Sequence, residues 1–290
     1  MLKIDHVTIA GKELSLLEKA FAAFGLKTDY GGVHSNGITH MSILGFTDGS
    51  YIELISTVTQ KASPLWNEHI SKNGGPCAWA VEVEDINAET ERLKKLGLSV
   101  RGPTYYTRRR PDGVLIEWDL TFLGSREPGS TLPFLIKDRT KRELRVHPSP
   151  SLSVEYERGR LLSELLCGIG YVVLGVHDLR KTAQLFRKVY GWSYSKEGGS
   201  TQLGAQIAWS PRNPAILASP TESDWLLNRL AEFGDSPCAF IITTRDMEAA
   251  IRRFNLGMSE EWFGYKVAWF DPSKLNGIRL GVIDSRLQKQ

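Results

Sequence analysis

The sequence contains little cysteine. Its three cysteines, Cys77, Cys167 and Cys238, are odd in number and far apart in a chain of 290 residues. This spacing argues against a disulfide framework and suits free thiols in a reducing compartment. The chain also lacks an apolar run long enough to span a bilayer, and its first residues run into a strand pattern without an apolar targeting segment. We therefore expect a cytoplasmic protein with no membrane partner.

The chain has no large excess of positive or negative charge, and it lacks the common nucleotide-binding motifs. The formal net charge of +3 is too small to predict a nucleic-acid partner, and the basic residues do not form one long block. There is no Gly-rich phosphate loop, no Ser-His-Asp order and no paired-cysteine metal motif. The composition, with 41% hydrophobic and 24% charged residues, is that of a soluble globular protein.

What the chain does contain is a repeated arrangement of strands and helices. The β-branched and apolar residues over 4–10 predict a strand, and the spacing of apolar residues over 13–24 predicts a helix. Two more strands are predicted over 39–46 and 51–57, joined by an Asp-Gly turn. Together these elements form one β-α-β-β-β unit.

Two sequence offsets indicate that this unit recurs. A Pro-Cys-Ala string returns 238 − 77 = 161 residues later, and the first strand pattern returns 169 − 4 = 165 residues later. Nearly equal offsets at separate places indicate duplication. We therefore predict an α+β fold of four β-α-β-β-β modules paired into two domains. The predicted parts are an N-terminal domain over 1–138 with modules at 1–57 and 75–138, a connection over 139–166, and a C-terminal domain over 167–290.

An ordered set of short strings makes the first half more specific. The strings are IDHVTIA, GGVH, ITH, DGSYIELIS, RRRPDG followed by W-x-L, and LPFLI. In this order the chain resembles the vicinal oxygen chelate superfamily, and within it the glyoxalase-like domain family of glyoxalase, bleomycin-resistance and dioxygenase type. The resemblance covers most of 1–138, and beyond 139 it is carried mainly by the pattern. It implies mixed sheets that curl around a shared cavity, with flanking helices.

The resemblance also implies where a metal would bind. Metal-dependent members take ligands from the first and fourth strands of each module, and His6 and Glu53 stand at these positions. An imidazole with a carboxylate suits a divalent metal such as Fe, Mn, Ni or Zn. The second module departs from the family pattern, because Ala78 and either Phe134 or Leu135 stand where its ligands would be. The expected ligand set is therefore incomplete.

A third ligand could come from His40 or His34. With a two-residue Asp-Gly turn, Leu44 lies near Glu53, so the side-chain alternation places His40 on the cavity face. Four residues separate His40 from Leu44, roughly 13 Å along a strand. This distance is too long for His40 and Glu53 to bind one metal unless the register slips or a bulge intervenes. His40 is therefore a candidate metal ligand only in that case and, more readily, a catalytic base or substrate contact. His34 follows a Gly-Gly pair and could swing in to bind substrate.

The run Arg108-Arg109-Arg110 has two interpretations. It could be a solvated hairpin tip, the usual fate of a charge run, or it could turn one arginine towards an anionic substrate, which guanidinium binds in bidentate fashion. We take Arg109 and Arg110 as candidate substrate-binding residues. In the second half, Tyr171 replaces His6, so we expect the C-terminal domain to be degenerate and to have lost any site.

Each candidate also has a purely structural alternative. His6 could be a half-buried strand histidine bonded to a backbone carbonyl. Glu53 could be a buried carboxylate paired with His6 or an arginine. These alternatives leave the chemistry of the cavity open.

Two functions follow from these candidates. The first is a metal-dependent lyase, isomerase or dioxygenase-type enzyme acting on a small oxygenated, anionic molecule, with His6, Glu53 and His40 as ligands and Glu53 and His40 in catalytic roles. The second is a metal-free small-molecule binding or sequestration protein, of resistance or sensor type. We expect a small-molecule partner, no nucleic acid, and either a monomeric pseudo-dimer or a homodimer.

Overall fold

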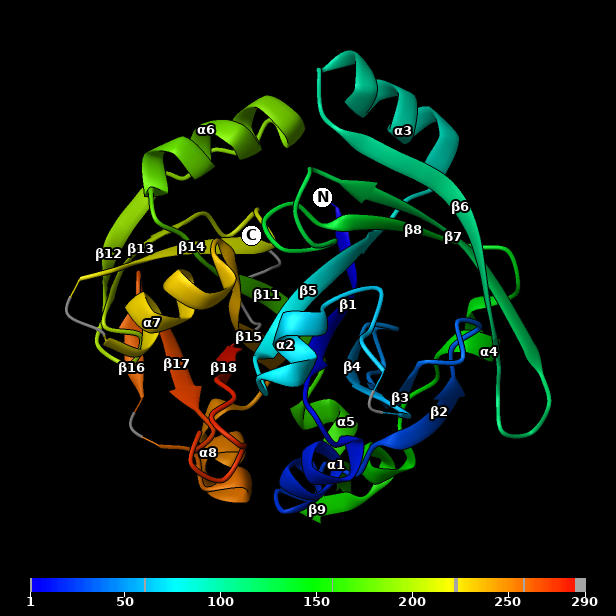
Figure 1. Ribbon diagram of the computed structural model, residues 1–290. Helices are drawn as coiled ribbons and strands as arrows, with labels where there is room; N and C mark the ends of the chain where they lie inside the picture. Colours follow the sequence, from blue (N-terminus) through cyan, green and yellow to red (C-terminus); the bar gives the residue numbers. More distant parts are fainter. Residues whose placement is uncertain (1, 60, 158, 222–223, 258, 285–290) are drawn as a thin grey trace.

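The fold consists of two eight-stranded sheets, each curled and flanked by helices (Figure 1). The computed structural model describes residues 2–59, 61–157, 159–221, 224–257 and 259–284. The first sheet comprises β1 (Lys3–Ala10), β2 (Asp29–Val33), β3 (Thr39–Gly45), β4 (Tyr51–Thr57), β5 (Gly75–Glu82), β6 (Val100–Arg109), β7 (Leu115–Leu123) and β8 (Phe134–Asp138). Its helices are α1 (Leu14–Ala22), α2 (Asn67–Ser71) and α3 (Ile86–Lys95).

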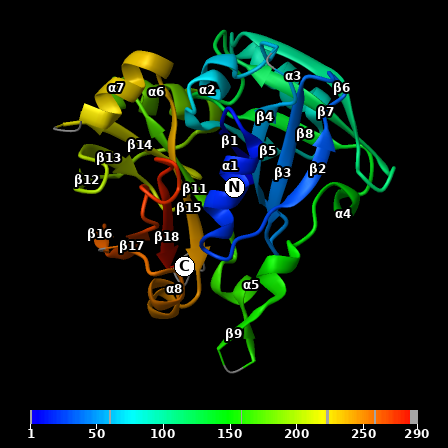
Figure 2. The same cartoon turned by 60° about the horizontal axis from the view of Figure 1, so that its bottom comes forward.

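The second half repeats this plan. Its strands are β11 (Gly168–Gly175), β12 (Lys196–Ser200), β13 (Ala205–Trp209), β14 (Ala215–Pro220), β15 (Ser236–Thr244), β16 (Glu260–Trp262), β17 (Tyr265–Trp269) and β18 (Leu280–Asp284), and its helices are α6 (Leu179–Tyr190), α7 (Asp224–Phe233) and α8 (Met247–Phe254). Between the halves lie α4 (Arg142–Arg145), the 3-10 turn η1 (Pro150–Ser153), β9 (Glu155–Glu157), β10 (Arg160–Leu161) and α5 (Leu162–Leu165). Figure 2 shows the region around β9 projecting from the body of the molecule.

The strand order proves the duplication. The first sheet runs β2-β3-β4-β1-β5-β8-β7-β6, and the second runs β12-β13-β14-β11-β15-β18-β17-β16, which is the same order with ten added. In both sheets the first strand pairs in parallel with the fourth and antiparallel with the fifth. The predicted α+β fold of four β-α-β-β-β modules with mixed, curled sheets is confirmed.

Local sequence explains where several helices begin. Asp85 precedes α3, and its carboxylate accepts hydrogen bonds from the backbone N–H groups of Asn87 and Ala88. Asp246 caps α8 in the same way through Ala249. Such caps satisfy N–H groups that have no partner inside the helix. The two aspartates occupy equivalent places in the second and fourth modules.

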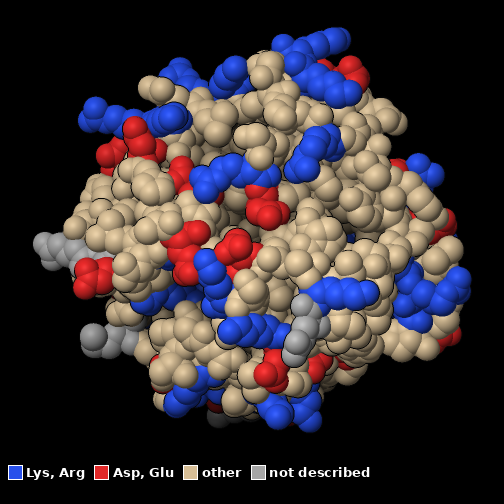
Figure 3. All heavy atoms as spheres, viewed as in Figure 1, with Lys and Arg blue, Asp and Glu red and all other residues tan. Residues whose placement is uncertain are grey.

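The two sheets share one core. β5 lies against β15 and β1 lies against β11, and residues of these strands, among them Val7, Trp79, Val172 and Phe240, belong to one buried apolar cluster. Side chains alternate along a strand, so His6, next to Val7, faces the cavity of its own sheet. On the face of the molecule that Figure 3 shows, basic and acidic residues are interspersed. Within the described residues, no helix is long and apolar enough to cross a membrane.

A buried histidine lies where the halves meet. His69 on α2 stacks on Phe233 of α7, with ring centroids 4.2 Å apart, and only 3% of His69 is exposed. Among the described residues neither of its ring nitrogens has a hydrogen-bond partner. Burial, with a smaller contribution from Arg229, lowers the pKa of His69 to about 3.

This environment makes the stability of the protein depend on pH. Because the pKa of His69 is depressed in the folded state, the unfolded chain binds the proton first as pH falls below about 6.5. We expect the free energy of unfolding to fall between about pH 6.5 and pH 4, by at most about 1.4 kcal/mol per pH unit from this residue. Urea denaturation across this range measures the slope. His69→Phe should flatten it, whereas the same slope in His69→Phe would contradict the assignment, and His147→Gln, at an exposed position, is the control.

Candidate functional site

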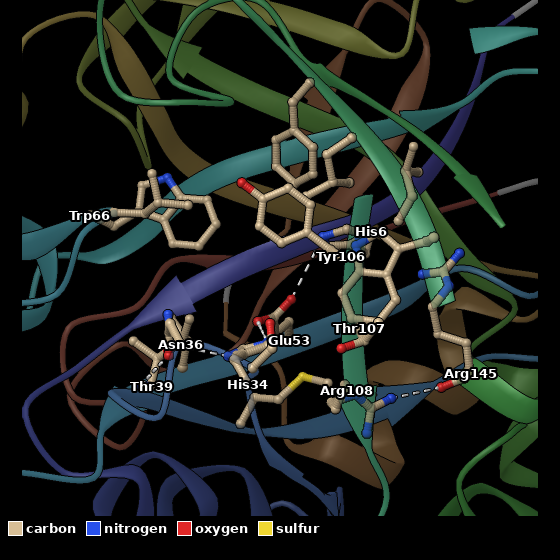
Figure 4. Close-up of a pocket in the computed structure, with 18 of the residues that line it drawn as sticks. His6, His34, Asn36, Thr39, Glu53, Trp66, Tyr106, Thr107, Arg108 and Arg145 are labelled. Atoms are coloured by element: carbon tan, nitrogen blue, oxygen red, sulfur yellow. Dashed lines mark hydrogen bonds and ion pairs between the residues drawn. The ribbon is translucent and has the colours of Figure 1, made fainter. Parts of the chain in front are cut away.

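The concave face of the first sheet holds a cavity of about 100 Å³. Figure 4 shows side chains from both modules of the first half converging on it. Its polar lining includes His6, His34, Asn36, Thr39, Glu53, Arg108 and Arg145, and its apolar lining includes Met41, Trp66, Trp118, Leu120 and Phe134. The cavity therefore combines a few buried polar groups with largely apolar walls, as small-molecule sites do.

Glu53 is the carboxylate on which two histidines converge. It lies on β4 opposite Thr8 of β1 and is 6% exposed. One of its oxygens is 3.6 Å from Nε2 of His6, and the other is 3.7 Å from Nε2 of His34. The parallel pairing of β1 with β4 brings His6 and Glu53 together, in line with the family resemblance, which places ligands on the first and fourth strands.

Two residues hold the imidazole ring of His6: Asp5 contacts a ring nitrogen, and Tyr51 stacks on the face of the ring. Its Nδ1 lies 2.6 Å from Oδ1 of Asp5, and the ring of Tyr51 stacks on it with centroids 4.6 Å apart and an interplanar angle of 15°. Burial alone would raise the pKa of Asp5, but Arg145 and His6 together hold that pKa well below its ordinary value. Asp5 is therefore an anion that accepts the Nδ1 proton, and Nε2 of His6 faces Glu53.

His34 reaches the cavity from the end of β2. Its backbone N–H donates to the carbonyl of Thr39, and its Nδ1 lies 2.9 Å from Oγ1 of the same residue. Burial lowers the pKa of His34 and Arg108 lowers it further, although Glu53 acts in the opposite direction. At neutral pH the imidazole is therefore uncharged and its Nε2 is available towards Glu53.

The same residue closes the sheet on itself. His34 forms an isolated antiparallel bridge with Arg108, which joins the two edge strands β2 and β6. The first sheet thus becomes a nearly closed barrel at the point where the cavity lies. Two residues that line the cavity are the residues that close the barrel.

His40 lies outside the cavity, which corrects the prediction made from the turn. Phe46 and Ser50 close a three-residue loop instead of a two-residue turn, so Ile43 and not Leu44 pairs with Glu53. A shift of one residue moves every side chain of a strand to the opposite face. His40 consequently lies beside Tyr30 on the other face, with ring centroids 5.9 Å apart.

The inward arginine is Arg108, not Arg109 or Arg110. Arg109 is exposed and donates to the carbonyl of Gly113 within its own hairpin, and Arg110 pairs with Asp112 there. Arg108 is 2% exposed and donates to the carbonyls of Gly31 and Arg145. The prediction that one arginine of the run turns inward thus fits Arg108. Arg109 faces the opposite side of β6 because side chains alternate along a strand, and Arg110 lies beyond the end of β6.

The other modules offer no equivalent ligands at the corresponding positions. Phe134 lies opposite Ala80, two residues after Ala78, just as Glu53 lies opposite Thr8, two residues after His6. Phe134 therefore occupies the carboxylate position of module two. In the second half the corresponding pair is Val173 with Ile216, two residues after Tyr171, and the side chains of Trp209, Trp262 and Trp269 fill a buried cluster there.

A family model described as a glyoxalase-like domain matches residues 4–156, which is 153 of 290 residues. The chain belongs to the glyoxalase-like domain family. The resemblance inferred from the ordered strings is confirmed. No curated protein is significantly similar to this glyoxalase-like protein in sequence.

Solved structures share the fold of this glyoxalase-like protein over its whole length. A hypothetical protein from Staphylococcus aureus is 13% identical with a TM-score of 0.62, covering 98% of this chain and 100% of that one. A triply substituted 4-hydroxymandelate synthase from Streptomyces coelicolor is 11% identical with a TM-score of 0.62, covering 98% and 92%. Methylmalonyl-CoA epimerase from Mycobacterium tuberculosis is 18% identical over 44% of this chain and 95% of that chain, with a TM-score of 0.36. At these identities the two full-length matches show the fold alone.

The donor set of the glyoxalase-like domain fits a divalent metal in its chemistry. His6, His34 and Glu53 provide two imidazoles and one carboxylate, a set that open transition-metal sites use. Two ligand atoms that each lie about 2.1 Å from one cation are roughly 3–3.6 Å apart, close to the 3.6 and 3.7 Å seen here. Within the described residues no group of three His, Cys, Asp or Glu already has the arrangement of a metal site, so these side chains would have to draw together slightly.

Sequence reasoning missed the residues that support this set. Asp5 directly precedes His6 in the string IDH, which is a signal that could have been used. Arg145 contacts Asp5 from 140 residues away, and it belongs to the segment that the sequence assigned to a connection. No local pattern indicates such a contact.

The position of Arg108 leads to a stability prediction. Arg108→Gln removes a buried guanidinium that ties β6 to β2 and to α4, so we expect a loss of about 1–3 kcal/mol in the free energy of unfolding. Arg109→Gln, at the adjacent exposed position, should change it by no more than about 0.5 kcal/mol. Urea denaturation of both variants makes the comparison. Equal losses would contradict the inward placement of Arg108.

Proposed function

We propose that this glyoxalase-like protein is a metal-dependent enzyme of lyase, isomerase or dioxygenase type that acts on a small oxygenated anion in the N-terminal cavity. The observation that carries this proposal is the convergence of His6 and His34 on Glu53, with Nε2 to oxygen distances of 3.6 and 3.7 Å. Imidazole and carboxylate ligands suit Fe(II), Mn(II), Ni(II) or Zn(II). Bound there, such an ion would polarise oxygen atoms of the substrate.

The electrostatics of the set support a cation between these groups. Nε2 of His6 faces a carboxylate oxygen of Glu53, while Nδ1 donates to Asp5. Two electron-rich atoms that face each other in a buried site repel unless positive charge lies between them. Either a proton or a metal ion satisfies this demand, and three converging donors favour the metal.

The remaining lining residues define what the substrate would meet. Trp118 and Phe134 form apolar walls, which exclude water and strengthen electrostatic interactions inside. These walls would hold a small molecule beside Glu53.

An anionic substrate follows from the charges. Arg108 and Arg145 line the cavity together with Glu53, and Asp5 lies directly behind His6, so two cations face two carboxylates. A divalent ion would leave the cavity with excess positive charge, which an anion would balance. Arg108 is the candidate anchor, since its Nε has no hydrogen-bond partner among the described residues.

A second candidate function is metal-free binding of a small molecule in the same cavity. Phe134 at the carboxylate position of module two favours it, because the family's full ligand set is then incomplete. The mainly apolar lining would hold an aromatic or aliphatic ligand without a metal.

The proposal also includes location and assembly. All three cysteines are free thiols, which suits a reducing compartment such as the cytoplasm. The shared core between the sheets already covers one face of each, so a monomer with an internal pseudo-dimer satisfies the packing.

Metal binding tests the main proposal. Isothermal titration calorimetry of untagged protein with Mn(II), Ni(II) and Zn(II) should show one metal-binding site in the wild type. His34→Ala and Glu53→Ala should each weaken binding by about tenfold or more, because each removes one of three ligands.

His40→Ala is the matched control, since His40 lies on the neighbouring strand but on the face away from the cavity. Its affinity should equal that of the wild type. A wild type that binds none of the three metals, but in which benzoate quenches tryptophan fluorescence, would favour the second function instead.

A further inference from the structure

We infer that Arg145 is a positioning residue for His6, and that the segment carrying it is therefore part of the active site; this inference rests on the proposed role of His6. The segment is residues 139–153, which contains α4 and η1, and is called the strap below. The sequence suggested only a connection here. Three contacts of Arg145 and the fit of the strap against the sheet carry the inference.

Arg145 first fixes the edge of the imidazole. Its guanidinium donates from two nitrogens to the two oxygens of Asp5, at 3.0 and 2.7 Å. Asp5 in turn accepts the proton of His6 Nδ1 at 2.6 Å. A bidentate pair holds the carboxylate in one orientation, so the oxygen that meets His6 cannot rotate away, and the tautomer of His6 is set from behind.

Arg145 also fixes the face of the imidazole. Nη1 of Arg145, which donates to Oδ1 of Asp5, also donates to the hydroxyl of Tyr51 at 2.8 Å. The ring of Tyr51 stacks on His6. One guanidinium therefore restrains the in-plane partner and the stacking partner of one imidazole. This double restraint leaves the Nε2 of His6 directed at Glu53.

The strap is fitted closely to the sheet that it serves. Val146 packs in one cluster with Met41, Ile43 and Tyr51. The backbone N–H of Gly45 donates to Oγ of Ser149 at 3.1 Å, and a side chain at Gly45 would collide with the carbonyl of His147. Figure 4 shows Arg145 reaching the cavity from this side.

Two neighbouring charged residues, Asp138 and Arg142, have different contacts from those of Arg145. Asp138 accepts from Nε of Arg145 at 2.5 Å, which anchors the guanidinium at the end of β8. Arg142 also donates to Asp5, but it is less buried and donates to the carbonyl of Gly49 as well. Arg145 is 4% exposed and is the arginine that contacts both restraints of His6.

The test reads the tautomer of His6 directly, in the full-length protein. Ring ¹⁵N chemical shifts, measured at pH 8.5 with ¹⁵N-labelled histidine and assigned with His6→Gln, distinguish the Nδ1–H from the Nε2–H form. The wild type should show Nδ1–H. In Asp5→Asn the arginines should donate to the amide oxygen of the new asparagine, so that its NH₂ group points at Nδ1 of His6. Because this NH₂ group can only donate, Nδ1 must accept, and His6 should switch to the Nε2–H form.

The strap arginine is tested by three variants. Arg145→Gln should lose the single Nδ1–H form and bind Mn(II), Ni(II) or Zn(II) about 10–100-fold more weakly, the usual effect of removing a group that orients a ligand. Arg145→Lys keeps the charge but not the bidentate geometry, and should lie between Arg145→Gln and the wild type. Arg139→Gln is the control, because Arg139 belongs to the same strap but pairs with Asp119.

The outcomes separate this inference from the proposed function. An Nε2–H form in the wild type, or an unchanged Nδ1–H form in Arg145→Gln, overturns the inference. If Arg145→Gln does not fold, Arg145→Lys decides, and an Nδ1–H form and metal affinity equal to those of the wild type overturn the inference. If the tautomer changes as expected while the wild type binds no metal, Arg145 is a positioning residue and the metal-dependent function is wrong.

Discussion

Asp5 is a fully buried carboxylate, and its charge has to be balanced where it stands. Arg145 and Arg142 approach it from the strap and His6 approaches it from the same strand. These contacts bind a segment more than 130 residues away to the first strand. They also set the orientation of the imidazole that faces Glu53. The cavity, the strap and the pairing of β1 with β4 therefore depend on one another, and a change that leaves Asp5 uncompensated disturbs all three.

The duplication shows how one fold serves two purposes. In the first module the cavity face carries His6 and Glu53, whereas in the third module the matching positions are Tyr171 and Ile216. In the second half, three buried tryptophans, Trp209, Trp262 and Trp269, belong to the apolar cluster that contains Tyr171 and Ile216. The outer face of this half joins the core shared with β1 and β5. The second half thus stabilises the wall on which the first half builds its site.

The sequence predicted the fold, and the family resemblance implied that His6 and Glu53 lie close together. Repeated strings and equal offsets defined the modules, and the adjacency of the first and fourth strands brought His6 to Glu53. His40 was misplaced because a turn longer by one residue reverses the faces of a strand. Arg109 was misplaced for a similar reason, because it faces the opposite side of β6 from the buried Arg108. Arg145 could not be found at all, since its contact with Asp5 joins segments that no local periodicity relates.

The alternation along β1 keeps two sets of residues separate within one strand. Val7 and Ile9 belong to the core shared by the sheets, while His6 and Ala10 belong to the cavity side. The lining of the cavity and the packing between the two halves therefore depend on alternate positions of the same strand. New cavities could be engineered on this scaffold at every second residue, with the junction between the halves left as it is.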